Sequence, residues 1–283
     1  MIVCYRQFAC LLLLSSMLSA AAAEEPADSS SAEQALRTRW QEVYGEIAAS
    51  IEMSDGRSPL RLHDNPLLSY SNPVRSTDQH GSIFLWTDRG RPAVFGSIWS
   101  AENRTDHSLR NITHEFHSLS TSQNVQAIRD GRVQWSAGEP GIEWQTLADA
   151  PAPATTRSAR LVQMRDLARR LTAKITAPEE TELRLMPRPL YRYPEDTAGA
   201  MDGALLVFVL ATDPELILLI EADDSDKPVY RTAIARFGNV SMSVAYGDRQ
   251  IWSCDRGTPG RSEGKYYLHW RIDQRPANLT PAP

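Results

Sequence analysis

Apolar residues recur at every third or fourth position in two stretches of the chain. This spacing predicts two amphipathic helices, the second of which runs from Arg157 to Ile175. The two apolar stripes consist of Leu36, Trp40, Val43, Ile47 and Ile51, and of Leu161, Met164, Leu167 or Ala168, Leu171 and Ile175.

Most segments that follow each stripe predict strands, and two pairs of them predict hairpins. Residues 82–86 and 93–99 flank a turn-rich segment, as do residues 205–210 and 216–220. The second hairpin is apolar at nearly every position. Because a strand that is apolar on both sides must be covered on both faces, we expect the second helix on one face and the first half of the chain on the other.

Four blocks of sequence recur in the same order, between 117 and 126 positions later. Internal similarity of this kind is typical of repeated structural units. The blocks are Leu60-Arg61-Leu62 with Pro66, Leu67 and Tyr70, matched by Leu183-Arg184-Leu185 with Pro189, Leu190 and Tyr193; Leu85 to Asp88, matched by Leu210 to Asp213; Arg132 to Ser136, matched by Arg249 to Ser253; and Trp144, matched by Trp270.

These patterns predict an α+β protein made of two tandem-duplicated halves related by a pseudo-twofold axis. Each half would be a helix packed on an antiparallel sheet. The predicted segments are a signal peptide (1–23), a disordered linker (24–32), the first half (33–147), an Ala/Pro linker (148–156), the second half (157–275) and a flexible tail (276–283). The alternative is one irregular α+β domain in which the similarities are accidental.

The N-terminus has the pattern of a cleavable secretory signal. Arg6 precedes an apolar core that extends from Phe8 to Leu18, and Ala20 to Ala23 offer a cleavage site. The apolar core is shorter than the roughly 20 residues that a membrane-spanning helix needs. We therefore expect an exported, soluble protein of the periplasm or the cell exterior, with no stable membrane insertion after cleavage. The alternative is an uncleaved anchor.

The net charge limits the class of partner that we expect, and the cysteine content limits the disulfides that the chain can form. The formal charge of the whole chain is −5 and becomes −6 without Arg6, so that a nucleic-acid partner, which favours a basic face, is not expected. Cys254 is the one cysteine beyond the predicted signal, which excludes an intramolecular disulfide in the mature chain.

Histidines are distributed unequally between the halves. Five of the six lie in the first half, and only His269 lies in the second. His114, Glu115 and His117 are therefore candidate catalytic residues, with His80 or His63 as further members, and His114 and His117 are candidate zinc ligands. Neighbouring strand residues face opposite ways, so that only one of this histidine pair is expected to point into a shared site. The alternative is a polar strand edge facing solvent.

Other candidate sites depend on weaker patterns. Residues 260–264 match the letters of a hydrolase nucleophile elbow, but they lack the strand before and the helix after that this motif needs, and a loop explains them better. Residues 187–193 alternate basic and aromatic side chains. Such a segment could bind an anionic or aromatic ligand, or form an edge strand. The candidate binding residues are Arg188, Tyr191, Arg192 and Trp86.

Several segments together resemble a group of uncharacterised secreted proteins from planctomycete-type bacteria. They are Leu60 to Arg75, Phe84 to Pro92, His114 to Ser120, Leu183 to Tyr193 and Asp202 to Ala222. The resemblance implies export and a shared fold. It implies no catalytic residues, since the family has no established activity.

Two functions remain open at this point. The first is an exported binding or interaction module that takes an envelope or extracellular protein or a glycan in the groove between its halves. The second is a metal-dependent or His/Glu acid–base hydrolase that uses the first-half histidines. No cofactor is predicted, and zinc is the metal that the second function would take.

Overall fold

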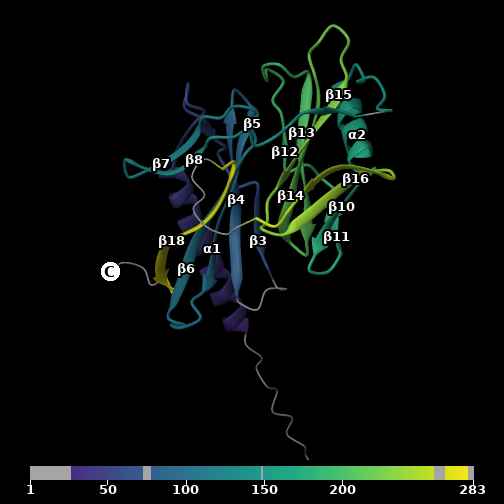
Figure 1. Cartoon of the computed structure of the whole chain (residues 1–283). Helices are drawn as coiled ribbons and strands as arrows, with labels where there is room; N and C mark the ends of the chain where they lie inside the picture. Colours follow the sequence, from purple (N-terminus) through teal and green to yellow (C-terminus); the bar gives the residue numbers. More distant parts are fainter. Residues whose placement is uncertain (1–26, 73–77, 148, 258–264, 280–283) are drawn as a thin grey trace, which may run out of the picture.

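The computed structural model shows a mostly β protein (Figure 1). It describes residues 27–72, 78–147, 149–257 and 265–279. Strands make up 50% of the structure and helices 13%. The described residues form two helices, α1 (Ala27–Ala49) and α2 (Arg157–Ala168). The α+β prediction, with a helix packed on each of two halves, is therefore wrong, because large curled antiparallel sheets make up most of the secondary structure.

The first lobe contains α1, a small sheet and a larger sheet. Within the described residues, the small sheet has the order β1–β7–β8, and the larger one has the order β18–β6–β5–β4–β2, with β3 also paired to β4. The strands are β1 (Glu52–Ser54), β2 (Arg61–Leu62), β3 (Leu68–Ser71), β4 (Gln79–Asp88), β5 (Arg91–Glu102), β6 (Leu109–Ser118), β7 (Val125–Arg129), β8 (Arg132–Ala137) and β18 (Tyr267–Pro276).

The second lobe contains α2 and one long sheet. Its described strands have the order β17–β16–β10–β11–β13–β14–β15–β9, with β12 also paired to β13. These strands are β9 (Gln145–Thr146), β10 (Leu171–Ala177), β11 (Thr181–Leu185), β12 (Tyr191–Arg192), β13 (Asp202–Leu210), β14 (Asp213–Ala222), β15 (Tyr230–Arg236), β16 (Ser241–Tyr246) and β17 (Arg249–Cys254).

The two lobes exchange their last strands. Strand β9 follows the first-lobe strands in the chain, yet it pairs with β15 of the second lobe. Strand β18 ends the second part of the chain, yet it pairs with β6 of the first lobe along most of its length. In Figure 1 the yellow β18 accordingly lies beside the blue strands rather than the green ones. Each lobe is thus completed by a strand from the other part of the chain.

The order of pairing is the same in both lobes, except that β10 also pairs with β11 in the second lobe whereas β1 and β2 belong to separate sheets. Strands β2, β4, β5 and β6 form a consecutive set with β3 beside β4, and β11, β13, β14 and β15 form the same set with β12 beside β13. Strands β1, β7 and β8 likewise pair as β10, β16 and β17 do. The similar sequence blocks that begin at Leu60 and Leu183 cover β2–β3 and β11–β12, which hold equivalent places.

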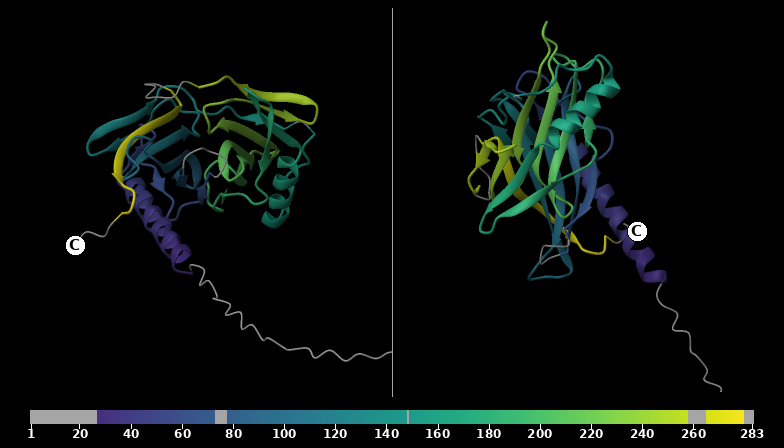
Figure 2. Two further views of the ribbon diagram at one scale, coloured as in Figure 1. Left: turned by 90° about the horizontal axis from the view of Figure 1, so that it is seen from below. Right: turned by 90° about the vertical axis from the view of Figure 1, so that its right-hand side faces the viewer.

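Three apolar clusters form the core. One lies between α1 and the first-lobe sheets, around Trp40, Trp86 and Phe116, and a second lies between α2 and the second-lobe sheet. The third joins the lobes, because Ile83 and Phe95 of β4 and β5 pack with apolar residues of β13, β14 and β15. We call this third cluster the seam, and the left view of Figure 2 shows the two lobes that it joins side by side.

The expected hairpins are present. They are β4–β5 and β13–β14, and the second is covered on both faces, by α2 on one and by the seam on the other. This part of the sequence prediction is confirmed, because continuous apolar sequence in a strand requires cover on both sides.

The second helix is shorter than its apolar stripe predicts. Helix α2 begins after the N-cap Thr156, whose hydroxyl accepts a hydrogen bond from the Ala159 N–H, and it ends at Ala168. Leu171 and Ile175 belong to β10 instead, where alternate residues are buried. Thr and Ile favour strands, so that the helical spacing of these last apolar residues was accidental.

The ends of the predicted segments also differ from the structure. Helix α1 begins at Ala27, inside the range 24–32 assigned to a linker, and β18 extends to Pro276. The predicted signal, residues 1–23, lies outside the described residues. Among the described residues, neither helix combines the length and the apolar character needed to cross a membrane.

Candidate functional site

A polar cleft opens where the apolar seam ends. We call it the seam cleft, and its volume is about 200 Å³. Both lobes contribute to it, and its lining combines carboxylates, amides and aromatic rings. The lining residues are Tyr70, Gln79, Trp99, Glu115, Asp213, Glu215, Phe237, Gly238, Asn239, Val240, Arg256 and His269.

Two carboxylates enter the seam cleft from the start of β14. Asp213 and Glu215 are both buried. The Asn72 amide donates a hydrogen bond to Asp213 over 2.6 Å, from the first lobe to the second. Glu215 lies so close to Gly238 that a Cβ there would approach its Oε2 to 2.1 Å. The glycine therefore leaves the space that Glu215 occupies, and a larger residue would displace it.

Buried tyrosines accompany these acids. The Tyr267 hydroxyl donates a hydrogen bond to Glu115. Burial raises the pKa of Tyr267 well above its usual range, and the charge of Glu115 raises it further. The pKa of Tyr70 is raised for the same reasons, first by burial and then by Asp213. Both phenols therefore stay protonated, and they act as hydrogen-bond donors rather than as bases.

The far wall of the seam cleft joins a histidine to an amide and a tryptophan. Asn239 Nδ2 lies 2.7 Å from His269 Nδ1, which accepts a hydrogen bond from it, so that the ring proton is assigned to Nε2. The rings of Trp99 and His269 lie 5.6 Å apart. The remaining amide oxygen of Asn239 is buried and has no hydrogen-bond partner among the residues the structure describes.

The structure separates the two histidines of the 114–117 segment. Both are buried on β6. The His114 ring packs on Phe116, which belongs to the core beneath α1. The His117 ring is on the other face, with Tyr266 and Tyr267, and its Nδ1–H donates to the Ser118 carbonyl over 2.7 Å. Glu115 alone of the predicted catalytic residues reaches the seam cleft.

This arrangement does not favour zinc binding by His114 and His117 together. Their side chains point to opposite faces of one strand, as the alternation of strand residues requires. Within the described parts of the chain, no three His, Cys, Asp or Glu side chains gather in a group that could hold a metal ion.

His117 is held in its neutral form. Burial lowers its pKa to about 3, and the Arg236 guanidinium lowers it too, whereas the Ser118 carbonyl acts in the opposite direction. The Nε2 atom of His117 is buried without a hydrogen-bond partner in the described structure. Protonation would place an unsatisfied N–H in the interior, which explains the low pKa.

Acid should therefore destabilise the protein through His117. Because its folded pKa is about 3 and its ordinary value is 6.5, protons bind preferentially to the unfolded chain below pH 6.5. Stability is then full above pH 6.5 and falls as the pH drops from 6.5 towards 3. For this residue the loss between pH 7 and pH 5 is about 2 kcal/mol.

Urea denaturation at pH 7 and pH 5 measures this loss. The His117→Asn variant should lose less stability than the wild type over that interval, by about the same 2 kcal/mol. His107→Asn is the matched control, because His107 is exposed. An unchanged pH dependence in His117→Asn would contradict the account.

The other candidate residues lie elsewhere. Trp86 is a core residue of the first lobe. Tyr191 and His63 line a separate groove, in which their rings meet edge to face at 5.6 Å. Arg192 also lines that groove, but its guanidinium binds the buried Asp202.

Arg188 is exposed between β11 and β12, and β12 is an edge strand whose one partner is β13. His80 lies beneath α1, in a cleft described below. The hydrolase-like string at 260–264 lies outside the described residues. Burial raises the pKa of the Cys254 thiol, which is consistent with an inert side chain.

Sequence reasoning missed most of the seam cleft. Asp213 and Tyr70 stand in the repeated sequence blocks and Trp99 ends a predicted strand, while Glu215 and Asn239 are not among the candidate residues. One signal was present, since Asp213 and Glu215 are acidic residues that directly precede the apolar run from Leu216 to Ile220. In three comparisons with known proteins, the chain matches no protein-family model, no curated protein and no solved structure.

Proposed function

We propose that the protein is a binding module that takes a small hydroxylated ligand, such as the end of a glycan, in the seam cleft. Support comes from the lining chemistry. Glu115, Asp213 and Glu215 offer acceptors, while Arg256 and the Nε2–H of His269 offer donors. A sugar carries both donors and acceptors on every hydroxyl, and such a lining can satisfy both.

The observation that carries the proposal is the buried, unpartnered amide oxygen of Asn239. Buried polar atoms are nearly always hydrogen-bonded, and each exception calls for an explanation. This atom belongs to a residue that lines the seam cleft, and a hydroxyl group of a bound ligand would satisfy it. A buried oxygen without a hydrogen bond costs free energy in the free protein, which is consistent with a preformed site for a ligand.

The size and shape of the seam cleft define the ligand further. Its volume of about 200 Å³ lies below the range of roughly 300–1,000 Å³ for drug-sized pockets, so that one ring fits rather than a long chain. Trp99 is half-buried and offers a flat apolar face against which the C–H side of a sugar ring can lie. The predicted export of the chain agrees with a glycan as partner.

The hydrolase alternative receives less support. It needs His114, Glu115 and His117 to act on one substrate, yet His114 lies in the core beneath α1 and His117 is hydrogen-bonded and buried. Only Glu115 faces the cleft. Binding therefore remains the function that the arrangement favours.

Calorimetric titration with a panel of neutral monosaccharides and disaccharides tests the proposal. We expect at least one sugar to bind, and Trp99→Ala to weaken it about two- to tenfold, because an aromatic contact of this kind contributes about 0.5–1.5 kcal/mol. Trp270→Ala is the matched control. Trp270 follows His269 on the same strand but is 43% exposed and lies outside the cleft, so that its loss should leave binding unchanged.

The panel should include simple amines, since carboxylates outnumber basic groups in the cleft. Binding of an amine with no sugar response would replace the proposed ligand class by a cation held against Trp99. No binding by either class, or equal effects of the two tryptophan variants, would contradict the proposal.

A further inference from the structure

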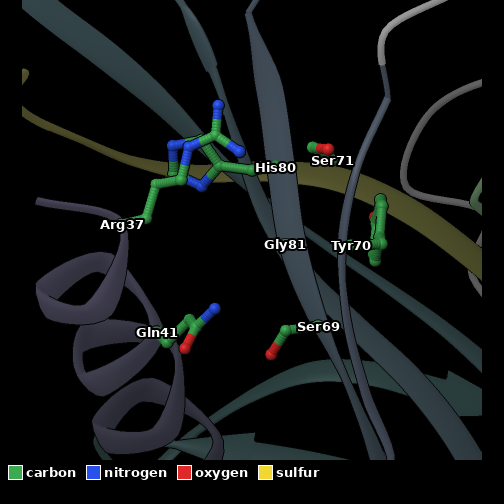
Figure 3. Close-up of a pocket in the computed structure, with 7 residues that line it drawn as sticks. All are labelled: Arg37, Gln41, Ser69, Tyr70, Ser71, His80 and Gly81. Carbon is green, nitrogen blue, oxygen red and sulfur yellow. The ribbon is translucent and has the colours of Figure 1, made fainter. Parts of the chain in front are cut away.

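A second cleft lies between α1 and the strands β3 and β4 (Figure 3). We call it the α1 cleft, and its volume is about 160 Å³. Its only charged lining side chain among the described residues is an arginine, and the others bear hydroxyl, amide or imidazole groups or are glycine. The lining residues are Arg37, Gln41, Ser69, Tyr70, Ser71, His80 and Gly81. Tyr70 also lines the seam cleft.

A chain of buried hydrogen bonds beneath this cleft leads from donor to acceptor, from Arg110 to His80. Arg110 Nε donates to Ser100 Oγ over 2.8 Å. The Ser100 hydroxyl lies 2.6 Å from the Tyr44 hydroxyl, which lies 2.9 Å from His80 Nδ1. Arginine can only donate, so the serine hydroxyl is free to donate to Tyr44. The Tyr44 hydroxyl has two acceptors within reach, His80 Nδ1 and, farther away at 3.2 Å, the His80 carbonyl oxygen, and we assign its proton to the nearer Nδ1.

This direction assigns the tautomer of His80. Because Nδ1 accepts a hydrogen bond from Tyr44, the ring proton lies on Nε2, on the opposite side of the ring. His80 therefore brings an N–H donor to the cleft that its ring lines. Arg37 and Gln41 reach the same cleft from α1, and Figure 3 shows Arg37 beside His80.

We propose that the α1 cleft binds a single oxyanion group, a phosphate or a carboxylate, between Arg37 and His80. The donors come from a guanidinium, an imidazole N–H, the Gln41 amide and the hydroxyls of Ser69 and Ser71. Charge-assisted hydrogen bonds from such groups are the usual means of holding an oxyanion. Glu33 competes with such an anion for Arg37, because the two side chains form an exposed ion pair at 2.8 Å.

The charges around His80 are consistent with an anion site. Burial lowers the pKa of His80 to about 4, and Arg110 and Arg37 lower it further, whereas Asp78 acts in the opposite direction. Asp78 is itself tied to Arg110 at 2.7 Å. The positive surroundings therefore disfavour a charged imidazole in the free protein. A bound oxyanion would neutralise them and raise the pKa of His80.

Nuclear magnetic resonance of the histidine side chains tests the proposal on the intact protein. His80 is titrated with pH in the absence of added anion, and then with inorganic phosphate or acetate. We expect at least one anion to shift the His80 signals and to raise its pKa by about one unit. Arg37→Gln should weaken that anion at least about tenfold, because the substitution removes the charge-assisted hydrogen bonds of the guanidinium.

Arg39→Gln is the matched control, because Arg39 is exposed on the same helix and does not line the cleft. A second variant, Tyr44→Phe, keeps the ring but removes the hydroxyl that positions His80, and it should also weaken the anion. If only phosphate shifts the His80 signals, the ligand of the α1 cleft carries a phosphate group. If only acetate does so, the ligand carries a carboxylate. No response to either anion, or equal binding by the two arginine variants, overturns the proposal.

Discussion

Replacing Asp202 by asparagine should lower the free energy of unfolding by about 3–5 kcal/mol. The Asp202 carboxylate is fully buried. It binds Arg160 at 3.1 Å and Arg192 at 2.7 Å, and Arg157 lies at 3.6 Å. Asparagine keeps the shape of the side chain but removes its charge, so that three guanidinium groups lose their shared counter-ion in a water-poor region. Breaking a buried ion pair from one side is costly for this reason.

Asp166→Asn is the matched control for this prediction. Asp166 lies on the same helix as Arg160, and its ion pair with Arg169 at 2.6 Å is exposed. Exposed pairs of this kind contribute about 0–1 kcal/mol. Urea denaturation of both variants at neutral pH measures the difference. Equal losses in the two variants would show that Asp202 does not hold α2 to β12 and β13.

The same cluster contains one residue of the segment 187–193, for which the sequence predicts ligand binding or an edge strand. Arg192 stands in a run of alternating basic and aromatic residues, a pattern that fits anion binding. Its guanidinium instead binds Asp202, which precedes an apolar run in the sequence and gives no sign there of a cluster. The pairing depends on how β12 lies along β13, which the local pattern does not determine.

Local patterns predicted local structure best. The hairpins β4–β5 and β13–β14 follow from apolar strands that flank turn residues, and the two-sided cover of β13–β14 follows from its composition. The fold class was wrong because helical spacing continued by chance into β10, and because strands in large curled sheets make up 50% of the structure and helices only 13%. Periodicity cannot show which element will cover a face.

The candidate site was largely hidden for a related reason. Its lining comes from β3, β4, β5, β6, β14 and β18, and from the residues after β15 and β17, so that no single segment carries its chemistry. Trp99 and Tyr70 look like core residues in their own strands. The burial of Asp213 and Glu215 becomes visible only when the lobes are in place.

The exchange of last strands predicts that neither lobe folds by itself. Without β18, the first lobe would lose one of the two strands that pair with β6, and with it the buried Leu268. Trp135 would also lose its hydrogen bond to the Lys265 carbonyl at 2.9 Å. Without β9 and the residues on either side of it, the second lobe would lose the buried Leu147 and the contact of Trp144 with Arg231. An open strand edge and an exposed core promote aggregation.

The two parts should nevertheless assemble when they are made together. If the chain is divided between Ala150 and Pro151, one fragment carries β9 for the other lobe, and the second fragment carries β18 in return. Both exchanged strands and the apolar seam then hold the fragments together. Ending the second fragment at residue 257 removes β18 but keeps the seam residues of β13, β14 and β15, and therefore separates the two contributions.

The most direct measurement is the co-purification of fragments 27–150 and 151–279 from cells that produce both, with an affinity tag on one of them. The account predicts an equimolar complex that unfolds in a single cooperative transition, while fragment 27–150 made alone, or made with fragment 151–257, is unfolded or aggregated. A folded, monomeric 27–150 fragment with its own cooperative transition would contradict the claim that each lobe is completed by the last strand of the other.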